Sequence, residues 1–371
     1  MSSSRAFVDG LLKKADVIIG GGRPWDITVS DGRLFDSVLS YGTLGLGEAY
    51  MDGWWDSKAL DQFFCKVISA GLEKDVQRNW HTLFLLLKAR FANRQSRKRA
   101  TVVAHEHYDL SAELYMSFLD PYNQYTCGYF KNTDSLNVAQ EQKLDLICKK
   151  LQLKSDDRVL DIGCGWGGFA KYAAKQYGVH VTGITLSKEQ LAYAKEFTKG
   201  LDVELRLQDY RDLHGTFDKI LVCGMIEHVG HKNYREMMEI VNKNLTDDGL
   251  FLLHTIGYSR SVYTTDPFID KYIFPGGMPP SIAQIGRAID KLFVTEDLHN
   301  FGSDYDKTLM AWFHNFDSAW PKLKNKYDQR FYRMWKYYLL SCAGAFRSRD
   351  IQLWQIVLSK RGVPGGYQSM R

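Results

Sequence analysis

The chain has 371 residues and a formal net charge of +5, with 45% hydrophobic and 25% charged residues. This length suits one large domain or two ordinary ones, and the composition excludes wholesale disorder. The charge excess is too small for a dedicated nucleic-acid binder, whereas a weakly basic surface suits anionic lipids.

The cysteines and the apolar runs restrict the type of site and the location. Six cysteines are scattered without a CxxC pair, which argues against zinc and against a disulfide framework. No run approaches the roughly 18 apolar residues that cross a bilayer, and the first residues lack a signal-peptide pattern. We therefore expect a cytoplasmic protein that holds no metal.

The first hundred residues differ in character from the rest. Residues 5–75 predict a small mixed segment, in which the dense glycines of 41–55 indicate tight turns and close backbone packing. In 76–100 an aliphatic run precedes six basic residues. This pattern is typical of a solvated helix with a basic linker, and a membrane-surface contact is the alternative. We place the domain boundary here, giving domains 1–95 and 96–371.

Beyond residue 100 the elements alternate. Residues 101–150 are helical around a loop at 122–130, and helices are expected at 167–177 and 188–198. The predicted strands are 158–162, 180–185, 203–207, 219–223, 250–255 and 351–358. Such alternation predicts an α/β fold with a doubly wound, mostly parallel sheet. Residues 258–345 interrupt it with helical patterns at 305–320 and 327–346, and we interpret them as a helical lid over the ligand crevice.

The motif DIGCGWGG at 161–168 follows a strand and opens a helix. Glycines let the backbone approach a ligand at a helix N-terminus, and Gly163, Gly165 and Gly168 also fit a dinucleotide fingerprint. Asp161 decides between the two, because a carboxylate there repels a pyrophosphate and attracts the ammonium group of S-adenosylmethionine. The second strand also lacks the acid that holds a dinucleotide ribose. Asp209 and Tyr210, which end the third strand, are placed to meet the adenine.

Several motifs together resemble the bacterial cyclopropane-fatty-acyl-phospholipid synthases over essentially the whole chain. They are GLGEAYMDGWW (45–55), EHYDL (106–110), QYTC (124–127), DIGCGWGG (161–168), GMIEHVG (224–230), LHTIG (253–257) and CAGAFR (342–347). The resemblance implies a Rossmann-like class I S-adenosylmethionine methyltransferase domain behind an N-terminal domain that meets lipid and a partner subunit. It also implies a homodimer at the inner-membrane surface that binds phospholipid bilayers and no nucleic acid.

The implied reaction transfers a methylene group from S-adenosylmethionine to the cis double bond of a phospholipid acyl chain, leaving S-adenosylhomocysteine. A bicarbonate ion acts as the base. By matching, the ion would lie among Cys127, Glu227, His254, Tyr305 and the backbone of Ile256, with Cys342 near the pocket. The residues expected around the cofactor are Tyr125, Thr126, Asp161, Gly163, Gly165, Trp166, Gly167, Thr185, Ser187, Gln190, Asp209, Tyr210 and Cys223.

Two positions depart from the family pattern. Thr126 stands where serine is common and keeps the hydroxyl. Ile226 replaces an aromatic residue beside Glu227, which affects the shape of the pocket.

The chemistry is consistent with this residue set. Methylation of an alkene creates a carbocation, so the site must exclude water and offer aromatic faces, which 258–345 can supply. Ring closure needs only a modest base, and Glu227 can take a proton from bicarbonate. We favour Glu227 over His228, because only Glu227 matches the family ligand. No step requires a nucleophilic thiol, so Cys127 is interpreted as a neutral wall and Cys342 as a packed residue.

Three alternatives remain at this point. A methyltransferase of the same fold acting on another lipid or small molecule would need no anion site. A nucleic-acid methyltransferase would account for the basic run at 88–99 but lacks a recognition module. A non-catalytic cofactor-binding regulator would not need the polar residues at the sheet edge.

Overall fold

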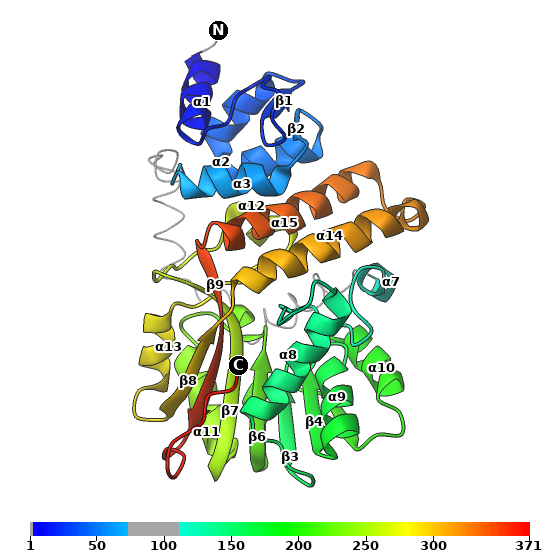
Figure 1. Ribbon diagram of the computed structural model, residues 1–371, viewed down its shortest axis with the longest axis vertical. Helices are drawn as coiled ribbons and strands as arrows, with labels where there is room; N and C mark the ends of the chain where they lie inside the picture. The colour runs from blue at the N-terminus through cyan, green and yellow to red at the C-terminus, as the bar shows by residue number, and fades with distance from the viewer. Residues whose placement is uncertain (1–2, 73–110) are drawn as a thin grey trace. The chain divides into compact units, whose positions relative to one another are not determined.

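The computed structural model describes residues 3–72 and 111–371 and is shown in Figure 1. The chain forms two compact units, one made of 1–92, 263–275 and 305–351, the other of 93–262, 276–304 and 352–371. The predicted lid at 258–345 is thus divided between them. The boundary near residue 95, the basic run at 88–99 and the motif at 106–110 lie outside the described residues.

The first unit is mainly helical. It contains α1 (Ser3–Lys14), α2 (Arg33–Met51), α3 (Leu60–Ser69), α12 (Pro267–Tyr272), α14 (Ser303–Leu323) and α15 (Gln329–Arg347), with the antiparallel pair β1 (Ile27–Val29) and β2 (Trp55–Ser57). Helices α3 and α15 cross at Gly344, where a Cβ atom would lie 2.8 Å from the Asp61 carbonyl oxygen. The Arg347 guanidinium joins the helices by pairing with Asp61 and Asp306.

The prediction of tight turns at 41–55 is wrong, because α2 continues through most of this segment. Only Gly42 departs from helical geometry, with φ 59° and ψ −131°. The expected close packing is confirmed: a Cβ on Gly45 would clash with the Ser37 carbonyl, and one on Gly47 with the Phe268 ring. The glycines make room for neighbours, and the gain from that packing outweighs their low helix propensity.

The second unit is a seven-stranded sheet in the order β5-β4-β3-β6-β7-β9-β8. Strands β5, β4, β3, β6 and β7 pair in parallel, and β8 pairs antiparallel with β9. The strands are β3 (Arg158–Ile162), β4 (His180–Thr185), β5 (Val203–Leu207), β6 (Phe217–Cys223), β7 (Leu245–Tyr258), β8 (Val294–Asn300) and β9 (Ile351–Ser359). The predicted doubly wound, mostly parallel sheet is confirmed.

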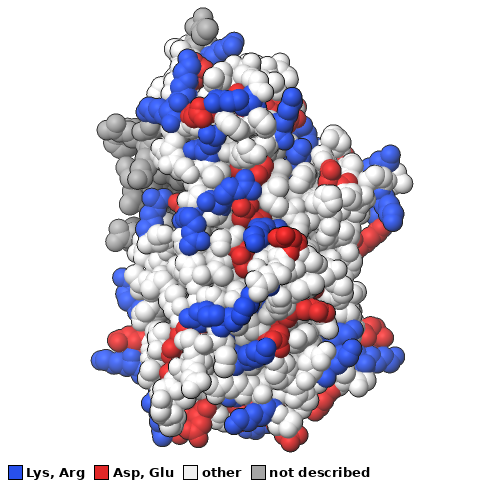
Figure 2. All heavy atoms as spheres, viewed as in Figure 1, with Lys and Arg blue, Asp and Glu red and all other residues white. Residues whose placement is uncertain are grey.

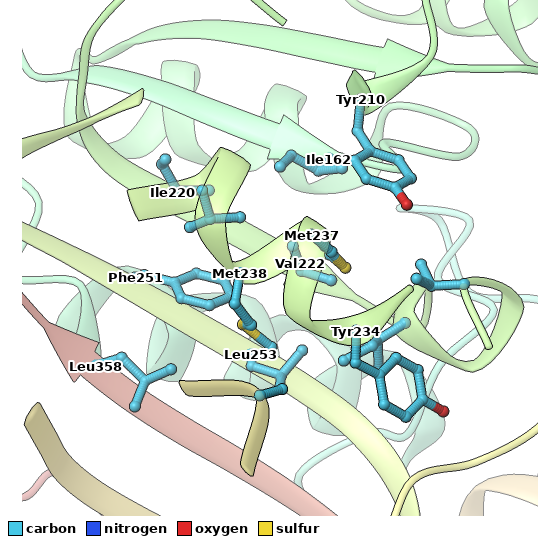
Figure 3. Packing of buried hydrophobic residues seen from close by; sticks show 14 of the residues in the cluster. Ile162, Tyr210, Ile220, Val222, Tyr234, Met237, Met238, Phe251, Leu253 and Leu358 are labelled. Carbon is cyan, nitrogen blue, oxygen red and sulfur yellow. The ribbon is translucent and has the colours of Figure 1, made fainter. Parts of the chain in front are cut away.

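Helices cover both faces of this sheet. They are α7 (Ala112–Met116), α8 (Leu136–Lys150), α9 (Gly168–Tyr177), α10 (Lys188–Phe197), α11 (Tyr234–Asn244) and α13 (Ile282–Ile289), with short 3₁₀ turns η1 (Tyr210–Asp212) and η2 (Ile226–His228). On β7, Phe251 and Leu253 pack with α11 and α13, as Figure 3 shows for α11, while Leu250 and Leu252 pack with α8 and α9. Burial on both faces explains the continuous apolar run at 250–253 of β7.

Strand β8 was not predicted. Its sequence, VTEDLHN, is largely exposed along its length, and it lies at the edge of the sheet. A solvent-facing edge strand carries few apolar residues and therefore gives little hydrophobic signal. Among the described helices, none is long and apolar enough to span a bilayer.

Candidate active site

The carboxyl ends of four parallel strands bring the predicted polar residues together. The strand order reverses around β3, which pairs with β4 on one side and β6 on the other. Ligands bind at such a switch point, beyond the carboxyl ends of the strands. Asp161 and Thr185 lie at the ends of β3 and β4, and Cys223 pairs in register with His254 across β6 and β7.

The glycine loop between β3 and α9 needs its glycines for geometry. Gly163, Gly165 and Gly167 have φ values of 86°, 52° and 83°, a region that other residues rarely adopt. Space is also limited: a Cβ on Gly163 would lie 2.8 Å from Met225, and one on Gly168 would clash with the Tyr122 carbonyl. The loop therefore presents bare backbone at the start of α9, as a tightly bound ligand requires.

Asp161 is buried at the end of β3. Burial raises the pKa of its carboxyl to about 7, against the opposing effect of the Lys143 ammonium. A buried carboxylate of this kind is stabilised by an adjacent cation. The site therefore fits the ammonium group of an amino-acid ligand.

Lys143 was missed from the sequence. It is fully buried on α8, and its ammonium donates to Gln124 Oε1 at 2.6 Å and to Thr126 Oγ1 at 2.7 Å. From the same helix, Gln140 donates to the Thr126 carbonyl at 2.8 Å. Gln140 and Lys143 occupy positions of the helical repeat that face the core. Two long polar side chains at such positions were the sequence feature that could have identified Lys143 as a site residue.

These bonds hold the 124–127 loop against the end of β6. The Cys223 thiol lies 3.8 Å from Thr126 Oγ1, and a Cβ on Gly224 would touch the Thr126 methyl group. Tyr125, the next residue, packs edge-on against Tyr115 with ring centroids 5.2 Å apart. Tyr115 in turn contacts Trp166 of the glycine loop. Three predicted cofactor residues, Tyr125, Thr126 and Trp166, are thus linked by direct or shared contacts.

The residues after β4 form a polar turn. Ser187 caps α10 by accepting a hydrogen bond from the Gln190 backbone at 3.2 Å. Thr185 Oγ1 donates to Gln190 Oε1 at 3.2 Å and accepts from the Ser187 backbone. All three predicted residues therefore lie together at the end of β4.

The side chains after β5 make more contacts within the protein than we expected. The Asp209 carboxylate caps η1 and pairs with the Arg211 guanidinium at 3.0 Å. Tyr210 lies in the hydrophobic cluster beside Ile162 (Figure 3). Burial raises the pKa of its hydroxyl to about 12, against the opposing effect of the neighbouring Arg211 guanidinium. Their contact with the adenine stays a prediction.

Glu227 and His254 form the second polar group at this edge. Glu227, on η2, accepts a hydrogen bond from the Ile256 backbone at Oε1, at 2.8 Å, and burial raises its pKa to about 7. The His254 ring is held at Nδ1 by Gln355, 3.2 Å away. Burial, with Lys143 and Lys150 nearby, lowers the His254 pKa well below its ordinary value. The ring is therefore neutral at physiological pH.

Each of these two side chains has one unsatisfied polar atom. Glu227 Oε2 and His254 Nε2 are buried and meet no partner in hydrogen-bond geometry among residues 3–72 and 111–371, although the Thr255 hydroxyl, which donates to the Ile256 carbonyl, is near enough to the Glu227 carboxyl to lower its pKa. Buried polar atoms are normally paired, so an unpaired atom points to an absent ligand. A small oxyanion with its own hydroxyl fits, because it can accept from an N–H and donate to a carboxylate.

The remaining predicted residues are divided between the two units. Cys127 is fully buried beside Thr126. Burial lowers the pKa of His228 to about 4, leaving it neutral. Tyr305 and Cys342 belong to the other unit, where Tyr305 stacks on Phe346 and burial raises the Cys342 pKa to about 12. The place of Tyr305 and Cys342 in the site stays a prediction. Ile226, the first residue of η2, lies in the hydrophobic core. Within the described ranges, no group of three or more His, Cys, Asp or Glu residues could hold a metal ion.

Comparisons with known proteins identify the family of this chain. The family model for mycolic acid cyclopropane synthetases matches residues 95–356. A cyclopropane-fatty-acyl-phospholipid synthase of Escherichia coli is 52% identical over 361 residues, covering 97% of this chain and 94% of that protein. The chain belongs to the cyclopropane-fatty-acyl-phospholipid synthase family. As in its relatives, its fold is that of the class I S-adenosylmethionine methyltransferases.

Two further relatives bear on the cofactor and on the outcome of the reaction. The mycolic acid cyclopropane synthase CmaA1, solved with S-adenosylhomocysteine and CTAB, is 30% identical with a TM-score of 0.66, covering 70% of this chain and 98% of that one. A probable fatty acid methyltransferase of Pseudomonas putida is 39% identical over 68% of each chain. Members similar to this synthase therefore include one named for methyl transfer rather than for ring formation.

Proposed function

We propose that the enzyme transfers a methylene group from S-adenosylmethionine to the cis double bond of an unsaturated phospholipid acyl chain. The products would be a cyclopropane acyl chain and S-adenosylhomocysteine. The observation that carries this proposal is the pair of unsatisfied buried atoms, Glu227 Oε2 and His254 Nε2, at the sheet edge that also carries the glycine loop. A transfer to nitrogen or oxygen would not need such a site.

The chain's own residues suit three tasks in this reaction. S-adenosylmethionine would supply the electrophilic methyl group, and Asp161 with the glycine loop would hold its amino-acid end. His254 Nε2 and Glu227 Oε2 would hold a bicarbonate ion. With its pKa near 7, Glu227 is suited to take a proton from that ion and so make it a stronger base for ring closure.

The test is product analysis on vesicles of dioleoyl phosphatidylglycerol. Cyclopropanation and methylation that retains the double bond add the same mass to the chain, so mass alone cannot separate them. Proton NMR separates them, because cyclopropane methylene protons resonate upfield of other lipid protons. We expect these signals, growing with added bicarbonate. A methyl-branched alkene would support the second candidate, the open-chain methylation suggested by the Pseudomonas putida relative.

We also propose that the enzyme works on the inner-membrane surface as a peripheral homodimer in the cytoplasm. On α1, Phe7 is about half exposed, and Lys13 and Lys14 occupy the last turn, a combination that suits an anionic lipid surface. On the face shown in Figure 2, basic and acidic side chains are interspersed, in keeping with the small net charge. Vesicle co-sedimentation and analytical ultracentrifugation test the two parts separately.

A further inference from the structure

The partner of His254 determines which ring nitrogen carries its proton. Gln355 lies on β9, is fully buried, and places Nε2 at 3.2 Å from His254 Nδ1. An amide nitrogen donates hydrogen bonds and does not accept them. With the amide in this orientation, His254 Nδ1 is the bare, accepting nitrogen and the proton of the neutral ring is on Nε2, while Gln355 Oε1 is buried without a hydrogen-bond partner among the described residues.

The sheet explains why these two side chains meet. Strands β7 and β9 are neighbours, and His254 and Gln355 alternate with residues that pack on the opposite face. Leu252 lies two residues from His254 and Val357 two residues from Gln355, so each shares a face of the sheet with its neighbour. Both belong to the cluster against α8 and α9. At the Gln355 position, burying an apolar side chain would cost less free energy than burying an amide. The polar residue there points to a requirement of His254 rather than of the core.

The tautomer decides what the site can bind. Nε2 is the unsatisfied ring atom, and Glu227 Oε2 is unsatisfied at the same sheet edge. An N–H at Nε2 donates to an anion, whereas a bare nitrogen would repel it. The other polar groups that act on the ring are the ammonium groups of Lys143 and Lys150, which oppose a positive charge on it.

We propose that Gln355 is a positioning residue that holds His254 in its Nε2–H tautomer, so that the buried site offers a hydrogen-bond donor to a bound anion. The identity of that anion as bicarbonate rests on the proposed function. The tautomer does not, because it follows from the Gln355 contact alone. The two statements can therefore fail separately.

The first measurement is a long-range proton–nitrogen NMR correlation on enzyme labelled with nitrogen-15 histidine. The His254 signals are assigned by their absence in His254→Gln. We expect Nε2–H with a bare Nδ1, unchanged between about pH 6 and 8 because the ring stays neutral. Gln355→Glu places an acceptor at Nδ1 and should move the proton there or charge the ring. The matched control is Gln352→Glu, a half-buried position on the same strand, which should change nothing at His254.

The outcomes separate clearly. A proton on Nδ1 in the unaltered enzyme would overturn the proposal, as it would mean that the amide oxygen faces the ring. An unchanged tautomer in a folded Gln355→Glu would overturn it as well. If that variant does not fold, the tautomer of the unaltered enzyme decides alone. A switched tautomer with no loss of bicarbonate stimulation and unchanged S-adenosylhomocysteine affinity would confirm Gln355 while refuting the bicarbonate role.

Discussion

Replacing Glu227 by glutamine should raise stability and abolish turnover, and the two effects have the same cause. Burial raises the carboxyl pKa from 4.5 to about 7. The folded state therefore holds the proton more tightly than the unfolded chain does. The resulting stabilisation is complete below the unfolded pKa and is lost as pH rises through about 7.

The magnitude follows from the two pKa values. A difference of about 2.5 pH units at about 1.36 kcal/mol each gives roughly 3 kcal/mol. Glutamine cannot ionise and still accepts from the Ile256 backbone through its amide oxygen. Relative to Glu227→Gln, the unaltered enzyme should thus become less stable by about 3 kcal/mol as the pH rises from about 3.5 to about 8, with most of the loss between the two pKa values. Turnover should change in the opposite direction, rising through about pH 7 as the carboxylate forms.

The assay is urea unfolding of both proteins across this pH range, with vesicle turnover and S-adenosylhomocysteine titration measured on the same samples. The control is Glu141→Gln, an exposed position on α8, whose stability should follow that of the unaltered enzyme at every pH. Asp161 is present in all three proteins, so its titration cancels in the comparison. Stability curves that stay parallel from acid to alkaline pH would refute the burial argument, and near-normal turnover of Glu227→Gln would refute its role as a base.

Three further outcomes are expected. Lys143→Met removes two charged hydrogen bonds to the 124–127 loop and should weaken S-adenosylhomocysteine binding by about 10- to 100-fold in calorimetry, whereas Lys149→Met, exposed on the same helix, should not. Asp161 should release a proton when the ligand's ammonium group binds near pH 7. The binding enthalpy should therefore depend on the buffer, and it should not in Asp161→Asn. Gly344→Ala should destabilise the enzyme by about 1–3 kcal/mol through overpacking in thermal unfolding, whereas Gly286→Ala on α13, with no atom within 4 Å of the added carbon, should not.

The sequence was most informative where one element carries its own signal. The predicted bounds of β3, β4 and β5 match the structure: β3 and β4 are mostly buried strands, and β5, at the sheet edge, shows the apolar–polar alternation of a half-buried strand. The exposed edge strand β8 lacks a comparable apolar pattern. In α2 the packing of neighbours against Gly45 and Gly47 overrides a local preference for turns. These failures occur where tertiary contacts, rather than local sequence, set the structure.

The same limit applies to the site. Asp161 and His254 lie next to the last residue of predicted strands, and Glu227 comes four residues after one, so the sheet edge could be predicted from the chain. Lys143 and Gln355 sit in the middle of elements, and their partners are distant: Gln355 lies 101 residues from His254. The contacts between such central residues depend on the strand order and on the packing of α8. Neither can be predicted from local periodicity.

The two buried carboxyls show how one sheet edge can support two roles. Burial raises the pKa of both Asp161 and Glu227 to about 7. The Lys143 ammonium lowers the pKa of Asp161 but not that of Glu227. A cation from the ligand would therefore further stabilise the ionised form of Asp161. The pKa of Glu227 is lowered only by hydrogen bonds, and no cation among the described residues acts on it. It is therefore the carboxyl that remains free to take up and release a proton, which matches the division between a binding group and a base.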